Sequence, residues 1–188
     1  KILKKFSDKR IKLFKSKNYT SLYKARNLAI EKSKGKYIAF LDTDDIWKCN
    51  KLKEQIKFLQ KNNKYKIVFS NFIVYNESKK TKFIKYNFDL PFGDITQNLL
   101  DEYSLGIVTV LLEKSIFKKF KFNINYNIIG DFDFFINISK FFKIGCIQKP
   151  LAVYRYHSSS LSSNRLDTYI KEEVDWIKRN ENKLRKKG

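Results

Sequence analysis

The chain has 188 residues, 43% of them hydrophobic, which suits one domain with a buried core. No apolar run is long enough to span a membrane. The two cysteines, Cys49 and Cys146, lie far apart in sequence and argue against a disulfide framework. The net charge is +21, but the lysines are spread along the whole chain rather than gathered in one block. We therefore attribute most of the charge to a general bias of the composition toward lysine and not to a dedicated binding surface. Attraction to anionic lipid stays an additional expectation, since each lysine near such a surface contributes roughly 1 kcal/mol.

Apolar periodicity and turn residues predict alternating helices and strands. In chain order we expect the end of a helix at 1–6, a strand at 11–14, a helix at 21–33, a strand at 37–41, a helix at 46–61, strands at 67–75 and 81–86, a helix at 95–103, a strand at 106–112, a helix at 131–142, extended segments at 144–148 and 152–156, and a charged helix at 167–186. This alternation predicts an α/β fold, with a mostly parallel sheet flanked by helices.

The segment 34–47 carries the strongest signal. Its apolar run at 37–41 ends abruptly in Asp42, Asp44 and Asp45. Open α/β sheets place ligand sites at the carboxyl ends of their strands. Carboxylates this close together repel one another, so a hard divalent cation is an expected partner. Alternatively, Asp44 or Asp45 caps a helix that begins at Ile46.

The stretch ARNLAIEKSKGKYIAFLDTDDIW, residues 25–47, resembles the donor-binding core of the inverting family 2 glycosyltransferases, in which the aspartate cluster is called the DxD motif. The resemblance implies a GT-A-like, Rossmann-type fold over residues 1–164, followed by a charged C-terminal helix at 165–188. In the resembled family an earlier strand–helix unit and an acidic VDDGS-like motif open the fold. Neither is present in this sequence, so we expect the first strand–helix unit to be missing and the chain to be an N-terminal truncation.

The resemblance also implies how the nucleotide-sugar donor binds. Asp42 faces the donor ribose, while Asp44 lies by a Mn²⁺ or Mg²⁺ ion with Asp45 supporting it. A divalent ion of this kind offsets the charge of the donor diphosphate as the glycosidic bond breaks. Arg26 and Asn27 match a pair that lies beside the donor in the family. On the residues alone, a solvated helix face is the better explanation of this pair, and the motif context makes the two interpretations about equal.

A second acidic site begins at Gly130, in the sequence GDFDFF. In the resembled family this position usually has the sequence Glu-Asp-Trp-Asp, and its first aspartate is the general base that takes the proton of the acceptor hydroxyl. Asp131 matches that base. Gly130 replaces the usual glutamate, and Asn137 stands where an arginine is common. The simpler alternative is that Asp131 caps the adjoining helix, and Asp133 is the next candidate for the base.

The third site is Tyr-Arg-Tyr-His at 154–157, followed by a serine-rich segment. The family often closes its core domain with such a motif near the diphosphate or the acceptor. Arg155 suits bidentate phosphate contact, and His157 can ligate a metal through a neutral imidazole. A surface strand followed by a serine-rich loop is the alternative interpretation.

The sequence thus predicts metal-dependent, inverting transfer of a sugar from a nucleotide-sugar donor to a hydroxyl of a glycan or lipid-linked acceptor. We expect a cytoplasmic location with peripheral contact to an anionic membrane face, and no nucleic-acid partner. Three alternatives stay open: a haloacid-dehalogenase-like phosphatase, a basic nucleic-acid-binding module, and a fragment without activity.

Overall fold

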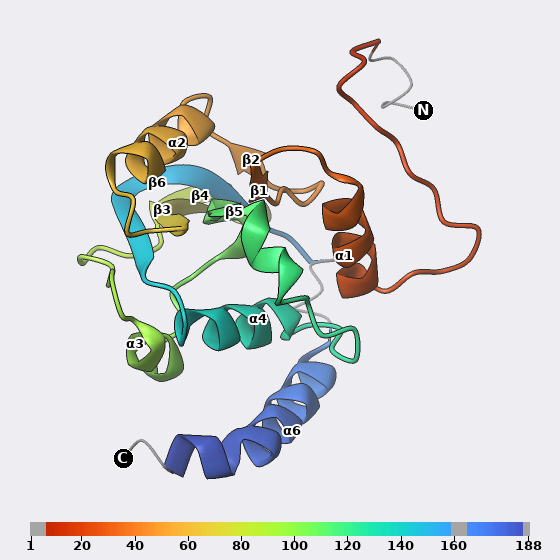
Figure 1. Cartoon of the computed structure of the whole chain (residues 1–188), viewed down its shortest axis with the longest axis vertical. Helices are drawn as coiled ribbons and strands as arrows, with labels where there is room; N and C mark the ends of the chain where they lie inside the picture. Colours follow the sequence, from red (N-terminus) through yellow and green to blue (C-terminus); the bar gives the residue numbers. More distant parts are fainter. Residues whose placement is uncertain (1–6, 159–164, 186–188) are drawn as a thin grey trace.

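A computed structural model describes residues 7–158 and 165–185 (Figure 1). The elements in chain order are α1 (Leu22–Lys32), β1 (Tyr37–Ala39), β2 (Ile46–Trp47), α2 (Lys51–Lys61), β3 (Ile67–Asn76), β4 (Thr81–Ile84), α3 (Thr96–Asp101), the 3-10 helix η2 (Ile107–Thr109), β5 (Leu111–Glu113), the 3-10 helix η3 (Lys114–Lys118), α4 (Gly130–Ser139), β6 (Ile144–Tyr156) and α6 (Leu166–Arg185). The predicted helix end at 1–6 lies outside the described residues. Within the described ranges, no helix combines the length and the apolar character needed to cross a bilayer.

The strands form one mixed sheet in the order β1-β5-β3-β6-β2, with β4 paired to β3 as a hairpin. The long strands β3 and β6 pair in parallel, whereas β1–β5, β3–β5, β3–β4 and β2–β6 are antiparallel. The α/β fold is confirmed, but the prediction of a mostly parallel sheet is wrong. β1, β3 and β6 do share one direction, as helical connections favour. The short β5 lies between β1 and β3 and runs against both, which sequence patterning does not reveal.

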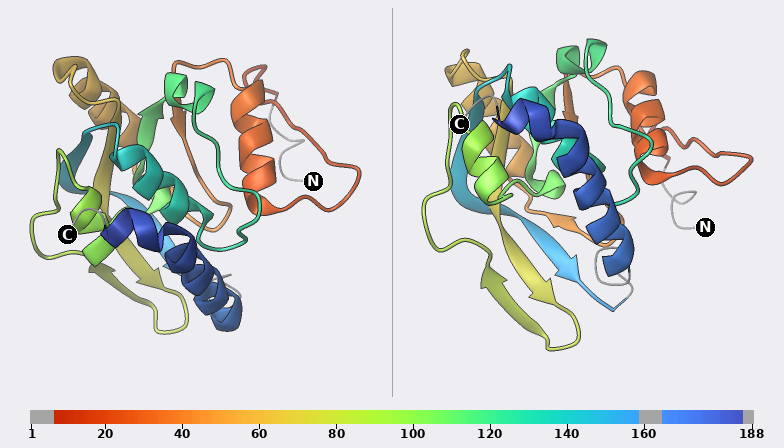
Figure 2. Two further views of the ribbon diagram at one scale, coloured as in Figure 1. Left: turned by 60° about the horizontal axis from the view of Figure 1, so that its bottom comes forward. Right: turned by 90° about the horizontal axis from the view of Figure 1, so that it is seen from below.

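Helices cover both faces of this sheet. Val68 and Leu111 of the sheet pack with Leu59 of α2 on one face. Ile67 and Phe69 point the other way, into the larger cluster that also contains the inner side of α4. Figure 2 shows α6 lying across the outer side of α4, with α3 beside it. The site elements α1 and α4 are thereby attached to a rigid, doubly covered sheet.

An aromatic stack joins the acidic end of β1 to α4. The Phe122 ring lies 4.4 Å from the Phe134 ring and 5.5 Å from that of Phe40, centroid to centroid. Phe117 stacks on Phe134 at 5.3 Å. Since Phe40 comes directly after β1, this cluster fixes the start of the acidic loop relative to α4.

Several predicted elements differ from the structure. The strand predicted at 106–112 is instead the 3-10 helix η2 followed by β5, and the extended segments predicted at 144–148 and 152–156 are one continuous strand, β6. The predicted strand at 11–14 is wrong: its side chains are exposed and the segment pairs with no strand among the described residues. The predicted helix at 46–61 is two elements, because Ile46 and Trp47 pair antiparallel with β6 and the helix starts only at Lys51. The interpretation of Asp44 or Asp45 as caps of a helix from Ile46 is therefore excluded.

Candidate active site

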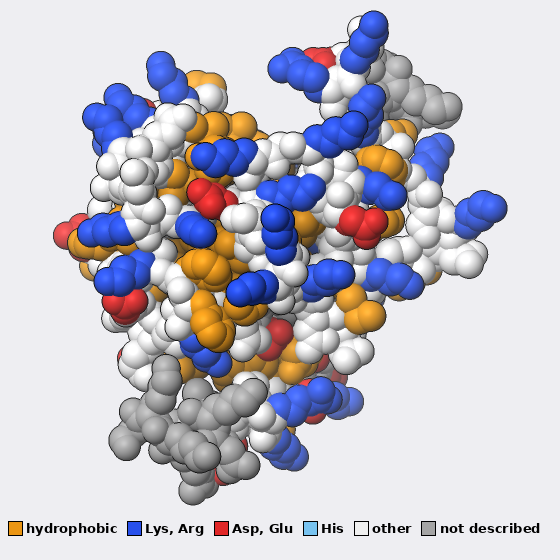
Figure 3. Space-filling view, viewed as in Figure 1, with side chains coloured by type: hydrophobic (Ala, Val, Ile, Leu, Met, Phe, Trp, Pro, Cys, Tyr) orange, Lys and Arg blue, Asp and Glu red, His pale blue; other side chains and the backbone are white. Residues whose placement is uncertain are grey.

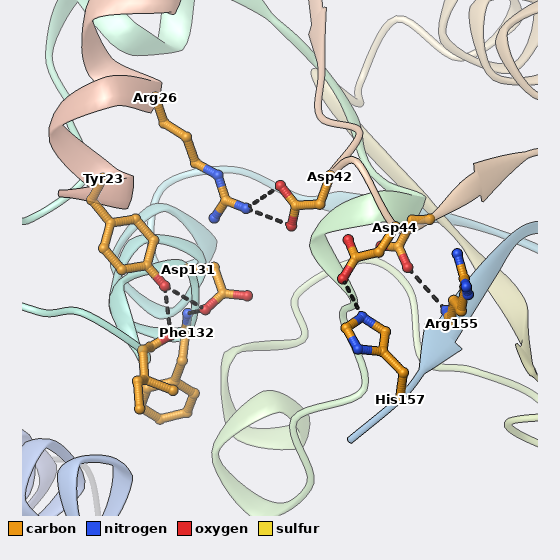
Figure 4. Close-up of polar contacts among 10 residues, drawn as sticks. Tyr23, Arg26, Asp42, Asp44, Asp131, Phe132, Arg155 and His157 are labelled. Atoms are coloured by element: carbon orange, nitrogen blue, oxygen red, sulfur yellow. Dashed lines mark hydrogen bonds and ion pairs between the residues drawn. The ribbon is translucent and has the colours of Figure 1, made fainter. Parts of the chain in front are cut away.

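The loop between β1 and β2 presents three carboxylates, each with a different partner (Figure 4). A turn closes the loop, in which the Asp45 amide donates to the Asp42 carbonyl at 3.2 Å. This turn brings together side chains that an extended strand would point to opposite faces. The loop is flanked by α1 on one side and by the end of β6 on the other (Figure 4).

Asp42 is held by Arg26 of α1. One guanidinium nitrogen of Arg26, Nη2, donates to both oxygens of Asp42 at 2.8 Å. The Arg26 side chain is buried, and its guanidinium lies 5.5 Å from the centre of the Tyr23 ring and 5.9 Å from that of Phe40. The buried side of α1 is thus Tyr23, Arg26 and Ile30, and not the alanine and leucine face that periodicity suggests.

Asp44 and Asp45 contact the end of β6. Asp44 Oδ2 lies 2.9 Å from Nε2 of His157, and Asp45 Oδ1 accepts the backbone N–H of Arg155 at 3.0 Å. Burial raises the pKa of Asp45 to about 6, and the neighbouring charges of Asp44 and Asp42 add to this shift. The repulsion among these carboxylates is the part of the shift that a bound cation would relieve.

The chemistry of these residues fits a divalent cation that is shared with a substrate. Among the described residues, no group of three or more His, Cys, Asp and Glu side chains is arranged to hold a metal ion. Asp44 and His157 nevertheless offer one carboxylate and one imidazole at adjacent positions. Mg²⁺ commonly takes one or two protein carboxylates and completes its shell with phosphate and water. The pair therefore fits an ion that binds together with a diphosphate.

Asp131 lies in the first turn of α4, next to α1. Its Oδ1 accepts the Phe132 amide at 3.0 Å and the Tyr23 hydroxyl at 3.3 Å. Burial raises the pKa of Asp131, while the Arg26 charge acts in the opposite direction. A carboxylate with a raised pKa is a better proton acceptor near neutral pH. Because α4 begins at Gly130, Asp131 is inside the helix and is not its N-cap.

Two other predicted site residues direct their polar groups elsewhere. The Asn27 amide bonds the main chain of Phe122 twice, donating at 2.8 Å and accepting at 3.0 Å. The Arg155 guanidinium donates to Glu77 at 2.6 Å, so only its backbone reaches the acidic loop. The predicted donor contacts of Asn27 and Arg155 stay predictions, and in this structure both residues fasten the frame around the site.

The C-terminal helix α6 fastens α4 from outside. Trp176 donates its indole N–H to Asp133 at 2.9 Å. Both Glu172 oxygens accept backbone N–H groups just before α4, those of Asn127, Ile128 and Ile129, at 2.6–3.1 Å. Asp133 is thus engaged in anchoring α6.

Sequence reasoning missed Tyr23, Glu172 and Trp176. Tyr23 stands three residues before Arg26, the spacing that places two side chains on one helix face, so the spacing carried a signal. Glu172 and Trp176 are four residues apart and so also share a helix face, but nothing in the local sequence indicates that this face packs against α4.

Comparisons with known proteins identify the family of the chain. Residues 1–141 match the family model "Glycosyl transferase family 2". The chain is 36% identical over 164 residues to UDP-Glc:alpha-D-GlcNAc-diphosphoundecaprenol beta-1,3-glucosyltransferase WfgD of Escherichia coli, covering 85% of this chain and 61% of that protein. It is 28% identical over 143 residues to the putative teichuronic acid biosynthesis glycosyltransferase TuaG of Bacillus subtilis, covering 75% of this chain and 55% of the relative.

Solved structures share the fold at low identity. A crystal structure of Staphylococcus aureus TarS 1–349 superposes with a TM-score of 0.56 at 15% identity, over 72% of this chain and 40% of that one. The same TarS segment in complex with UDP-GlcNAc gives a TM-score of 0.53 at 13% identity, over 78% of this chain and 42% of that one. The chain spans about 60% of the length of the WfgD relative. With its α/β fold and three quarters of its length matched, the chain belongs to glycosyl transferase family 2.

Proposed function

We propose that the protein to which this chain belongs transfers a sugar from a nucleotide-sugar donor to a hydroxyl of a lipid-linked glycan, with inversion at the anomeric carbon. One observation carries the proposal. Neighbouring side chains of α1 reach both acidic sites, since Arg26 holds Asp42 and Tyr23 contacts Asp131. A donor held at the loop and an acceptor held at Asp131 would therefore meet beside α1.

On the donor side, Asp44 and His157 would hold a Mn²⁺ or Mg²⁺ ion, with Asp45 supporting them. Such an ion neutralises diphosphate charge as the leaving group departs. Asp42, oriented by Arg26, would face the donor ribose. Asn27 and Arg155 would shape the surrounding frame, and direct contact with the donor stays a prediction for both.

On the acceptor side, Asp131 would take the proton of the attacking hydroxyl. An alcohol is a weak nucleophile until a positioned base accepts its proton. The Tyr23 hydroxyl and the Phe132 amide fix one carboxylate oxygen of Asp131. Attack from the side opposite the departing diphosphate inverts the anomeric carbon.

The relatives support the substrate classes. WfgD is named for a UDP-Glc donor and a GlcNAc-diphosphoundecaprenol acceptor, and one TarS structure contains UDP-GlcNAc. An acceptor anchored in a membrane would require a cytoplasmic enzyme to work at the membrane face, which fits the charge of +21. The family match leaves no support for the phosphatase and nucleic-acid-binding alternatives.

Donor binding tests the proposal. Calorimetry with UDP and Mn²⁺ on the whole protein should give saturable binding that weakens at least roughly tenfold with excess chelator or in Asp44→Ala, since a charge-neutralising ligand is lost. Asp94→Ala is the matched control, because Asp94 is an exposed aspartate that pairs with Lys143 on the surface. Unchanged affinity in both chelator and Asp44→Ala would refute the metal site.

A further inference from the structure

A cavity of about 760 Å³ opens between α3, the start of α4 and α6. Asp131 and Phe132 line its α4 side, and Tyr169, Glu173 and Trp176 line its α6 side. Its volume is in the range of small-ligand pockets. The acidic loop contributes no residue to this lining, so the cavity meets the proposed chemistry only at Asp131.

Tyr103 lines this cavity, and its hydroxyl lies beneath the surface of the wall. This hydroxyl is shielded from solvent and has no hydrogen-bond partner within the part of the chain that the structure describes. Buried hydroxyls nearly always have a partner, so an orphan one just behind a cavity wall can gain one when a ligand displaces the wall slightly. Burial, followed by the nearby charge of Asp131, raises the pKa of Tyr103, so its hydroxyl stays a donor at neutral pH.

A row of aromatic rings continues from Tyr103 toward α6. The Tyr103 ring lies 5.2 Å from the Phe132 ring, which lies 4.8 Å from that of Trp176. Aromatic rings with polar edges present an apolar body and a hydrogen-bonding end to the same ligand. A sugar ring, which has apolar faces and hydroxyls at its edge, matches such a wall.

An apolar stripe on α6 continues from the cavity. Its members recur at helical spacing and are each between 44% and 61% exposed: Leu166, Ile170, Val174 and Ile177. Ile177 also lines the cavity, so the stripe begins at its rim. Figure 2 shows α6 on the outside of the described structure. The positions 166, 170, 174 and 177 advance along one side of the helix.

We propose that this cavity binds the acceptor as an amphiphilic glycoside: the sugar beside Asp131 and Tyr103, and the apolar aglycone along the α6 stripe. The proposal rests on the proposed function for the identity of the reacting sugar. It adds the pocket, the role of Tyr103 as a donor to an acceptor oxygen, and α6 as the element that selects for an apolar tail. The continuity between pocket and stripe argues for one ligand that occupies both.

Binding of matched alkyl glycosides tests this. We would titrate the whole protein by calorimetry with the methyl and octyl glycosides of N-acetylglucosamine, below the micelle concentration. The octyl compound should bind at least roughly tenfold more tightly, because several CH₂ groups leave water. Val174→Asp should abolish that preference and leave methyl glycoside binding unchanged. Ile84→Asp, at an exposed isoleucine of β4, is the matched control and should retain the preference.

The hydroxyl has its own test. Tyr103→Phe should weaken both glycosides by about three- to tenfold, as expected for one hydrogen bond, and leave UDP–Mn²⁺ affinity unchanged. Three results would overturn the proposal: no binding, equal affinity for both glycosides, or loss of the preference in Ile84→Asp. If Val174→Asp no longer binds anionic vesicles but keeps its preference for the octyl glycoside, the stripe contacts a bilayer and not the aglycone. Binding of UDP–Mn²⁺ without binding of either glycoside would refute this pocket alone. Binding of the glycosides without binding of UDP–Mn²⁺ would refute the donor site.

Discussion

At the scale of single residues, α1 carries the side chains that relate the two acidic sites. Arg26 pairs with Asp42 and also lowers the pKa of Asp131 against the effect of burial. Tyr23 donates its hydroxyl to the Ile128 carbonyl at 2.5 Å, which fixes its ring beside Asp131. The two sites are therefore electrostatically coupled through a single helical turn.

Replacing Asp131 by Asn separates proton transfer from structure. Asn keeps an oxygen that can accept the Phe132 amide, so the melting temperature and UDP–Mn²⁺ affinity should stay close to those of the wild type. Turnover by the full-length enzyme should fall roughly 10²- to 10⁴-fold, the range for losing a positioned base. Asp133→Ala is the neighbouring control and should lose stability more than turnover, because it removes the oxygen that accepts the Trp176 indole N–H. Near-normal turnover of the Asp131 variant would assign the base elsewhere.

The buried Lys51 gives a pH-dependent prediction. Its Nζ donates to Gln55 at 2.8 Å and to the Val110 carbonyl at 3.3 Å, and burial lowers its pKa to about 7. In the unfolded chain this amine keeps its ordinary pKa of about 10.4. Between these values the unfolded chain binds more protons, so the contribution of Lys51 to the free energy of unfolding rises with pH.

Urea unfolding at pH 7 and pH 9 measures this contribution. The free energy of unfolding of the wild type, minus that of Lys51→Met, should increase between the two pH values, by up to about 1.4 kcal/mol for each pH unit. Lys53→Met, at an exposed position of the same helix, should show no such increase. An equal pH dependence in wild type and Lys51→Met would contradict a lowered pKa.

The sequence predicted part of the site because its acidic residues are adjacent along the chain. Asp42, Asp44 and Asp45 follow one strand, so local turn geometry is enough to gather them. The contact between Asp44 and His157 spans 113 positions and was inferred only through the family resemblance. Tyr103 and Glu172 take part through tertiary contacts, and no local pattern marks such residues.

At the scale of elements, the packing of α1 against α4 depends on the absence of a side chain at Gly130. A Cβ built there would lie 2.5 Å from the nearest Tyr23 ring atom. The ring has little freedom to move, since it stacks on Phe122 at 5.6 Å. This contact explains why the glutamate usual in the resembled motif is replaced by Gly130 here.

Gly130→Ala should therefore destabilise the protein even though Ala favours helices. Overpacking typically costs about 1–3 kcal/mol, which exceeds the roughly 1 kcal/mol gained in helix propensity. Chemical denaturation should show a net loss, whereas Gly106→Ala, whose nearest contact would be 3.4 Å, should be nearly neutral. In a Tyr23→Ala background the Gly130 substitution should become neutral or stabilising. A stabilised Gly130→Ala single variant would show that the ring moves freely.

Predictions of helices and strands succeeded where one face of a segment is buried. They failed where pairing with a segment distant in sequence determines the secondary structure. The strand predicted at 67–75 and the helix predicted at 131–142 correspond to β3 and α4. The segment 46–47 shares the helical periodicity of residues 51–61, yet its pairing with β6 makes it a strand. The apolar residues at 11–14 alternate as a strand would, but without a partner strand among the described residues they stay irregular.

At the scale of the whole molecule, the positive charge is diffuse. Figure 3 shows Lys and Arg side chains spread over the visible face, with no single continuous basic patch. Charge distributed in this way on the visible face attracts an anionic surface without favouring one spot on that face. Orientation would then depend on a local feature such as the bound acceptor, whose apolar aglycone lies along the α6 stripe in our proposal.

Vesicle sedimentation distinguishes these two contributions. Vesicles containing anionic phosphatidylglycerol should bind the protein at low salt, and most of this binding should be lost between about 50 and 300 mM NaCl, as screening shortens the reach of surface charge to less than about 10 Å. Pure phosphatidylcholine vesicles are the control and should bind little at any salt concentration. Changing one exposed lysine, as in Lys53→Met, should alter binding only slightly, because each lysine contributes roughly 1 kcal/mol near the surface. Binding that persists at high salt, or that depends on one lysine, would contradict diffuse attraction and indicate a specific lipid site.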